Sequence, residues 1–182
     1  MPPVSTRELT HAALFTALIA GGALVAIPIG SVPFTLQVLF VLLAGMLLGP
    51  RLAALSVLAY LALGLFAPVY AGGTSGLGVL LGPTGGYLWG FVLAALVTGA
   101  LSAPGQASLA RFVGAGLLGL VPIYALGAVW LAAQLHIGMG TALATGVAPF
   151  VWLDVLKAVT AGLAARSLVN LPLGLPSPQR GR

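Results

Sequence analysis

Two residues of opposite charge, Asp154 and Lys157, lie three positions apart inside an apolar segment near the end of the chain. On a helix, this i, i+3 spacing puts both side chains on one face. If that helix crosses a membrane, each charge costs roughly 2.5–3.5 kcal/mol at its centre on insertion scales, so such residues usually face a cavity and mark a functional site. The structural alternative is an internal ion pair that only neutralises itself.

The chemistry available to this pair is hydrogen bonding, because it places an acceptor-only carboxylate beside a donor-only ammonium. A cyclic urea has the complementary edge, with two N–H donors and one C=O acceptor, but amides and many heterocycles would fit as well. The segment begins near Pro149, on the side assigned below to the exterior, so the pair lies one to two helical turns from that surface. This depth suits a pocket that opens to the outside.

The composition shows what surrounds these charges. Of the 182 residues, 60% are apolar and only 5% are charged, whereas soluble domains carry roughly 25% charged residues. The surroundings must therefore be mostly lipid, where backbone groups have to be paired within helices or a closed barrel. The runs 36–48 and 52–63 are apolar on every face and lack the alternation of barrel strands. The sequence therefore predicts an all-α membrane protein.

A transmembrane helix needs roughly 20 apolar residues, and six segments approach this length, although the second and third are short. Breaks rich in Pro and Gly separate them. We expect a single six-helix transmembrane domain over residues 1–170, followed by a Pro-rich tail at 171–182 that has a composition typical of disorder. The predicted helices are Leu9–Ile29, Val32–Leu48, Leu52–Phe66, Gly86–Leu101, Phe112–Ala133 and Pro149–Val169.

The arginines predict the orientation. Six helices would place both termini, and the loops after the second and fourth helices, on one side of the membrane. All arginines fall in these regions, and the three opposite loops contain neither Lys nor Arg. Since positive charge is enriched on the cytoplasmic side, we expect both termini to be cytoplasmic. The residues concerned are Arg7, Arg51, Arg111, Arg166, Arg180 and Arg182.

The longest outer loop, residues 67–86, is a second candidate for ligand contact. Its glycines, among them Gly72 and Gly73, allow positive φ angles and close approach of the backbone to a bound molecule. Tyr70 and Tyr87 add rings with a polar tip. The alternatives are ordinary turn chemistry for the glycines and an interfacial aromatic belt for the tyrosines.

Two further features lie on the predicted helices. Gln37, early in the second helix, is a polar residue in an apolar run and is either a pocket donor or an interhelical hydrogen-bonding group. The first helix carries small residues at Ala13, Ala17 and Gly21. Such a stripe lets helix backbones approach closely, so it either docks another subunit or packs inside the bundle.

Other motifs exclude functions. The G-x-G-x-x-G pattern at 114–119 follows no predicted strand and lies inside an apolar span, so it does not indicate dinucleotide binding. No Walker motif is present, so any ATP hydrolysis requires a partner. The basic residues are scattered rather than clustered, which argues against nucleic acid. Gly73-Thr-Ser-Gly76 is similar to the nucleophile turn of rhomboid proteases, with His136 as a base, but both residues fall in predicted loops.

Three segments together make the sequence resemble the BioY family, the biotin-binding S components of energy-coupling factor (ECF) transporters. They occur in the same order on a chain of this length, and the resemblance extends from about Arg7 to Arg166. The segments are IPIGSVPFTLQVLFVLLAGMLLGPR at 27–51, YAGGTSGLGVLLGPTGGYLWGF at 70–91 and PFVWLDVLK at 149–157.

The resemblance implies a non-enzymatic bundle of the S-component type in the cell membrane of a bacterium or archaeon. Such a chain captures biotin from outside, associates with a transmembrane coupling subunit and two ATPases, and topples in the membrane to deliver the vitamin. It binds no cofactor itself, because ATP is hydrolysed by the partners. The family's alanine motif on the first helix corresponds to Ala13 and Ala17 and contacts the coupling subunit.

The resemblance also implies site residues. Asp154 and Lys157 match the pair that holds the ureido ring, and the loop from Tyr70 to Gly86 caps the ligand. Its members Gly72, Gly73, Thr84 and Tyr70, together with Tyr87 and Gln37, are therefore expected to contact biotin.

Two rival functions remain open at this point. In the first, the chain is a stand-alone secondary transporter or channel that uses Asp154 and Lys157 as a proton relay. In the second, and less favoured, it is an intramembrane serine protease with Ser75 as its nucleophile.

Overall fold

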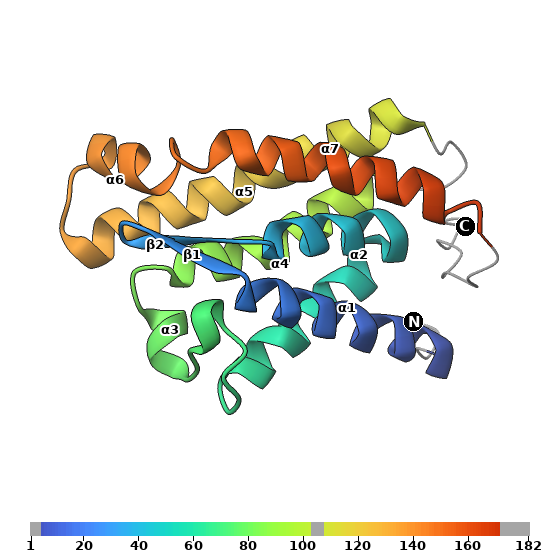
Figure 1. Cartoon of the computed structure of the whole chain (residues 1–182), viewed down its shortest axis with the longest axis horizontal. Helices are drawn as coiled ribbons and strands as arrows, with labels where there is room; N and C mark the ends of the chain where they lie inside the picture. The colour runs from blue at the N-terminus through green and yellow to red at the C-terminus, as the bar shows by residue number, and fades with distance from the viewer. Residues whose placement is uncertain (1–4, 103–107, 172–182) are drawn as a thin grey trace.

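The structure, a computed structural model, describes residues 5–102 and 108–171 and consists mostly of helices with one small hairpin (Figure 1). All but the first residue of the tail predicted at 171–182 lies outside the described residues. In chain order the elements are α1 (Thr6–Leu24), β1 (Ala26–Ile29), β2 (Val32–Thr35), α2 (Gln37–Gly64), the 3-10 turn η1 (Ala71–Gly73), α3 (Leu77–Leu81), α4 (Gly85–Leu101), α5 (Leu109–Leu135), α6 (Met139–Gly146) and α7 (Val151–Leu168).

The first helix starts at Thr6, three residues before the predicted Leu9, and ends earlier than predicted. The Ser5 hydroxyl accepts a hydrogen bond from the Glu8 backbone N–H, and the Glu8 carboxylate accepts one from the Ser5 backbone N–H. Such a capping box satisfies two backbone donors of the first turn. The predicted helix to Ile29 is wrong, since α1 ends at Leu24.

An antiparallel hairpin, β1–β2, replaces the end of the predicted first helix and the start of the second. Two prolines are the physical reason, because proline lacks an N–H and disfavours helical backbone at the preceding residue. Pro28 and Pro33 face each other across the hairpin, next to the closing pair Ile29–Val32. In a two-residue hairpin the closing pair is hydrogen-bonded, so the prolines occupy a pair that needs no ladder bond. Gly30 provides the positive φ, +63°, that the turn requires.

The long helix α2 is two helical arms that fold back on each other. Gly49, at φ 77° and ψ 174°, interrupts the helix just before Pro50. In a straight helix, Gln37 and Tyr60 would lie about 35 Å apart, yet the Gln37 Nε2 donates a hydrogen bond of 2.7 Å to the Tyr60 hydroxyl. Figure 1 shows the two arms running in opposite directions. They correspond to the second and third helices of the prediction.

Glycines allow the helices to pack closely. The helix α4 lies against α2 and α5, and α7 packs against α5 and α2. A Cβ at Gly99 of α4 would lie 2.6 Å from the Pro50 Cα, and one at Gly90 would lie 2.7 Å from the Ile123 Cα. The backbones of these helices therefore touch directly, as small-residue interfaces in membranes allow.

The outer surface of the bundle suits lipid. On α5, Leu118, Val121 and Val129 are each more than half exposed. By length and composition α5 can cross a membrane, and α6 with α7 can do so as a pair bent by 52°. The helix α2 is as apolar, but its length is divided between two arms at Gly49. The structure thus agrees with a helical membrane protein, while the count of six spans stays a prediction.

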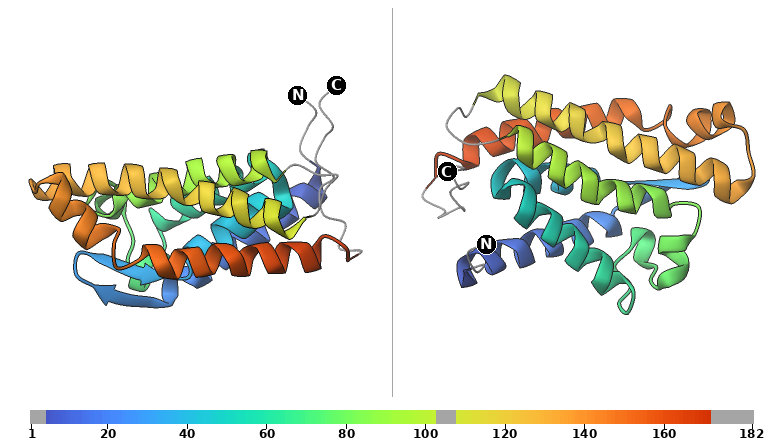
Figure 2. Two further views of the ribbon diagram at one scale, coloured as in Figure 1. Left: turned by 90° about the horizontal axis from the view of Figure 1, so that it is seen from above. Right: turned by 180° about the vertical axis from the view of Figure 1, so that it is seen from behind.

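The two ends of the molecule differ in charge. The start of α1, the bend of α2, the end of α4, the start of α5 and the end of α7 all lie at one end (Figures 1 and 2). Arg7, Arg51, Arg111 and Arg166 belong to these regions. The hairpin, α3 and the start of α7 lie toward the opposite end. This arrangement is what the arginine pattern requires, and the cytoplasmic location of the termini stays a prediction.

Candidate functional site

The charged pair lies at the start of α7 and is buried. Asp154 is 4% exposed and Lys157 is 7% exposed. The Lys157 Nζ lies 2.5 Å from the Asp154 Oδ1, so the i, i+3 spacing produces an ion pair on one face of the helix. Because buried charges are tolerated only when they are paired and hydrogen-bonded, the remaining bonds of both groups decide what the pair can do.

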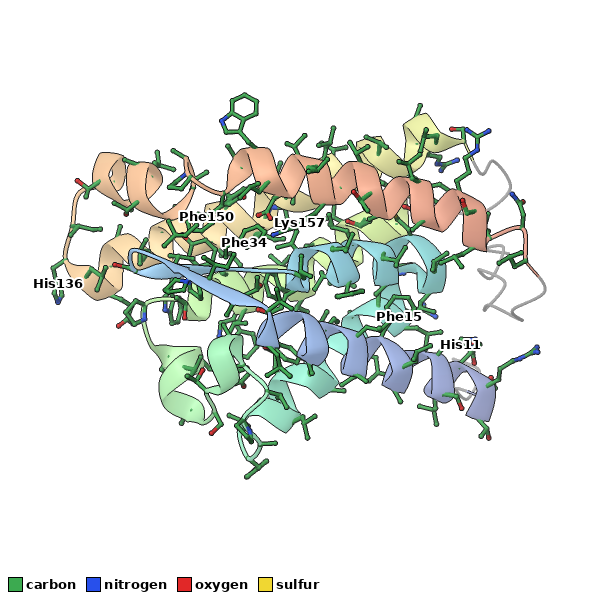
Figure 3. All side chains as sticks on the ribbon, in the orientation of Figure 1. His11, Phe15, Phe34, His136, Phe150 and Lys157 are labelled. Carbon is green, nitrogen blue, oxygen red and sulfur yellow. The ribbon has the colours of Figure 1, made fainter. Side chains whose placement is uncertain are left out.

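Lys157 joins α7 to the hairpin. Its ammonium also donates a hydrogen bond of 2.6 Å to the Thr35 carbonyl at the end of β2. It lies 3.9 Å from the centre of the Phe34 ring, in a cation–π contact. Figure 3 shows Phe34 of the hairpin, Lys157 of α7 and Phe150, the residue just before α7, near one another. One ammonium therefore holds the hairpin and the carboxylate in place.

Asp154 has a partner on α5 that the sequence reasoning missed. The Tyr124 hydroxyl donates a hydrogen bond of 2.6 Å to the Asp154 Oδ2. Both carboxylate oxygens are thus engaged, one by Lys157 and the other by Tyr124. The available signal was a tyrosine in the middle of an apolar span, where a polar tip needs a buried partner.

A cavity opens beside the pair. The hairpin, the first turn of α2, the start of α4, the middle of α5 and the start of α7 form its wall. Asp154 and Lys157 both line it, so the pair is not plugged against a neighbouring helix. Its apolar wall includes Phe34, Phe91 and Phe150. A cavity with aromatic walls and a few convergent polar groups is the usual form of a small-molecule site.

Most of the other predicted site residues reach this cavity. Gln37, Thr84, Tyr70 and Tyr87 all line it. Gly72 and Gly73 do not, since they are exposed in η1 with φ angles of +67° and +77°. Their contact with a ligand stays a prediction, as do the individual ligand roles of the other four.

Tyr70 of the predicted cap and Tyr87, which follows it, are both buried, which argues against an aromatic belt. The Tyr87 hydroxyl donates to the Gly146 carbonyl at 3.0 Å. The Tyr70 hydroxyl donates to the Leu61 carbonyl at 2.6 Å, and its ring meets Tyr60 edge-on. Each hydroxyl is therefore hydrogen-bonded to a backbone carbonyl, and each tyrosine forms part of the cavity wall.

Gln37 combines the two interpretations given to it. Its side chain is 2% exposed and bonds to Tyr60 on the other arm of α2, as an interhelical group would. Its Oε1 accepts a hydrogen bond of 3.0 Å from the Thr35 hydroxyl. It also forms part of the cavity wall.

The small residues of α1 point outward. Ala13 and Ala17 are exposed, whereas Ala12, Phe15 and Ile19 form the buried face of the helix. The stripe is therefore not used for packing inside the bundle, and Ala13 and Ala17 are available to a partner.

The residues of the protease hypothesis are separated from the cavity. Ser75 and His136 are both exposed, neither lines the cavity, and the described residues show no hydrogen bond between them. Figure 3 places His136 at the outer edge, at the end of α5. Among the residues that the structure describes, no group of three His, Asp or Glu side chains could hold a metal ion.

An apolar helical bundle around a cavity with one buried ion pair defines a membrane-embedded small-molecule-binding protein. Residues 1–172 match the family model for the BioY family, so the chain belongs to the BioY family, as the resemblance indicated.

Relatives and a solved structure agree with this assignment. The chain is 46% identical to the biotin transporter BioY of Thermotoga maritima, covering 91% of this chain and 97% of the relative. It is 43% identical to the probable biotin transporter BioY of Pyrococcus horikoshii, covering 91% and 98%. A crystal structure of the S-component for biotin from an ECF-type ABC transporter superposes with a TM-score of 0.81 at 32% identity, covering 90% and 91%. These proteins are named as transporters or as a transporter component, not as enzymes.

Proposed function

We propose that this chain is the biotin-binding S component of an ECF-type importer, located in the cell membrane. The family, the names of its relatives and the fold support this function. The observation that carries it is the buried pair Asp154–Lys157, which faces the cavity with hydrogen-bonding positions still open.

The open positions follow from the bonds that are already made. An ammonium has three N–H donors, and Lys157 uses two of them on Asp154 and the Thr35 carbonyl. A carboxylate has about four acceptor positions, and Asp154 uses two of them on Lys157 and Tyr124. Within the described residues this leaves one donor and about two acceptors, which is the complement of a cyclic urea with one C=O and two N–H groups.

In this proposal the rest of the vitamin contacts the cavity wall. The fused rings of biotin pack against the aromatic side chains of Phe34, Phe91 and Phe150. The carboxylate tail points toward the loop after α2. Since the predicted outer loops contain no Lys or Arg, backbone N–H groups, hydroxyls such as that of Thr84, or water receive the tail.

Transport requires partners that the chain does not contain. Ala13 and Ala17, exposed on α1, dock the transmembrane coupling subunit, and two ATPases of the same module hydrolyse ATP. The whole S component then topples, which exposes the bound biotin to the cytoplasm. In this proposal the chain binds no cofactor, crosses the membrane six times and keeps both termini in the cytoplasm.

Direct binding tests this function. Purified protein in nanodiscs is titrated by calorimetry with biotin and with lipoate, which has a carboxylate tail and a sulfur ring but no urea. We expect saturable binding of biotin and none of lipoate. Equal binding of the two would contradict a urea-reading site, and biotin uptake into liposomes without any ATPase would favour the stand-alone transporter.

A further inference from the structure

The hydroxyl of Tyr124 contacts the one carboxylate of the cavity on the oxygen that Lys157 leaves free. Its distance of 2.6 Å to the Asp154 Oδ2 is typical of a hydrogen bond from a hydroxyl to a charged oxygen, which is about twice as strong as a neutral one. Lys157, on the same helix as Asp154, contacts Oδ1. The carboxylate is therefore held by two helices, through residues that are 30 positions apart in sequence.

This arrangement fixes the direction of the acceptor positions. The last torsion of an aspartate side chain is soft, so one bond alone allows the carboxylate plane to turn. A bond to each oxygen, one from α7 and one from α5, stops this rotation. The open positions of Asp154, a residue of the cavity wall, are then held in one orientation.

The same two donors also balance the charge of Asp154. Lys157 forms an ion pair with it, and this is the one ion pair found among the described residues. Tyr124 takes up negative charge density on the oxygen farther from the ammonium. A neutral ligand with N–H donors needs only acceptor positions here, whereas a cationic ligand needs net negative charge in a site of low dielectric.

We infer that Tyr124 is a positioning residue that, with Lys157, orients the Asp154 carboxylate and makes the site prefer a neutral urea to a cationic guanidinium of the same shape. This inference rests on the proposed function, because it takes the ureido ring to lie at Asp154.

The ring of Tyr124 has a separate role that substitution can spare. It lines the cavity and also an apolar groove on the outer face between α5, α6 and α7. The ring is thus the partition between the binding cavity and the lipid-facing side. Tyr124→Phe keeps this partition and removes only the hydroxyl.

The experiment compares biotin with 2-iminobiotin, whose ring carbonyl is replaced by an imine that is protonated at neutral pH. Calorimetry in nanodiscs is performed on the wild type and on Tyr124→Phe. We expect biotin to bind about tenfold more weakly in the variant, as for loss of a hydrogen bond to a charged group. We expect 2-iminobiotin to weaken by less than about threefold, so that the preference for biotin falls.

The control is Tyr60→Phe. It also removes one buried tyrosine hydroxyl, which has a hydrogen bond of 2.7 Å to Gln37, but Tyr60 does not line the cavity. Its preference for biotin should equal that of the wild type. A second variant carries 3-fluorotyrosine at position 124, where the more acidic hydroxyl is a stronger donor and the preference for biotin should rise. Because it keeps the hydroxyl, it decides the matter even if Tyr124→Phe does not fold.

Three outcomes are distinguishable. Equal weakening of both ligands in Tyr124→Phe, or no weakening of either, would overturn the role of Tyr124. An unchanged preference in the fluorotyrosine variant would overturn it as well. If the wild type binds no biotin, it is the proposed function that fails.

Discussion

Two buried polar clusters meet at Thr35 and differ in charge and in the elements that they join. The first, Asp154 with Lys157 and Tyr124, is charged and keeps hydrogen-bonding positions toward the cavity. The second, Gln37 with Thr35 and Tyr60, is neutral, and its members bond to one another. We call these the charged cluster and the neutral cluster.

The comparison separates two uses of polar groups inside an apolar protein. A neutral cluster whose members bond to one another holds elements in register, here the hairpin and the two arms of α2. A charged cluster in the cavity wall favours a ligand more strongly, because a buried charged group without enough partners costs more free energy than a neutral one. Burial alone does not distinguish them, since Gln37 and Asp154 are 2% and 4% exposed.

The largest effect should come from breaking the charged cluster. Asp154→Asn keeps the shape of the side chain but leaves the Lys157 ammonium without its counter-charge and offers the urea only one carbonyl. We expect biotin binding to weaken by about 2–5 kcal/mol, as for one partner of a buried charge pair. Calorimetry with biotin measures this, and an unchanged affinity would remove Asp154 from the site.

Breaking the neutral cluster should instead reduce stability. Gln37→Met has a similar length but leaves the Thr35 and Tyr60 hydroxyls without this partner, which costs about 1–3 kcal/mol of unfolding free energy. Biotin affinity should change by less than about threefold. Thermal unfolding in detergent and calorimetry separate the two quantities. A large loss of affinity with normal stability would show that Gln37 reads the ligand directly.

A smaller effect is expected at the ring beneath the ammonium. Phe34→Leu keeps an apolar contact but removes the cation–π interaction with Lys157. Such interactions contribute about 0.5–2 kcal/mol, so biotin binding should weaken by less than in Asp154→Asn. The matched change Phe91→Leu, at another wall position away from the described cation–π pair, should leave a smaller loss. If both substitutions had the same effect, the rings would act only as apolar wall.

The smallest effect on the isolated chain is expected from a residue outside both clusters. Ala17→Leu adds bulk to the exposed face of α1, so stability should change by no more than about 0.5 kcal/mol, and biotin affinity should not change. Co-purification with the coupling subunit should be lost, because the close approach of helix backbones requires small residues. Normal assembly in this variant would place the docking surface elsewhere.

The parts of the fold that could be predicted are those that follow from the order of apolar, polar, Gly and Pro residues along the chain. Apolar runs marked the helices, and the Gly49–Pro50 break separated two helices that lie antiparallel in the structure. The pair Asp154–Lys157 was recognisable because charged side chains are rare inside an apolar span and usually face a cavity there. Its position on the cavity wall agrees with that reasoning.

Other parts had no such signal. The hairpin needs the two prolines to face each other, and this depends on a pairing that periodicity does not show. The bond from Lys157 to Thr35 ends on a backbone carbonyl, which every residue has. Tyr124 meets Asp154 only because α5 and α7 pack side by side, so its role follows from tertiary contact rather than from sequence spacing.

The carbonyl that receives Lys157 has a consequence for how this hairpin tolerates sequence change. Since any amino acid at position 35 provides a carbonyl, exchanging Thr35 for another strand-forming residue keeps the anchor of the ammonium. Insertion or deletion of one residue in β2 would turn the side chains that follow it to the opposite face. Because successive carbonyls of a strand point to opposite edges, it would also turn the carbonyl at the end of β2 away from Lys157. Homologous hairpins should therefore keep the same number of residues between the turn at Gly30 and the start of α2.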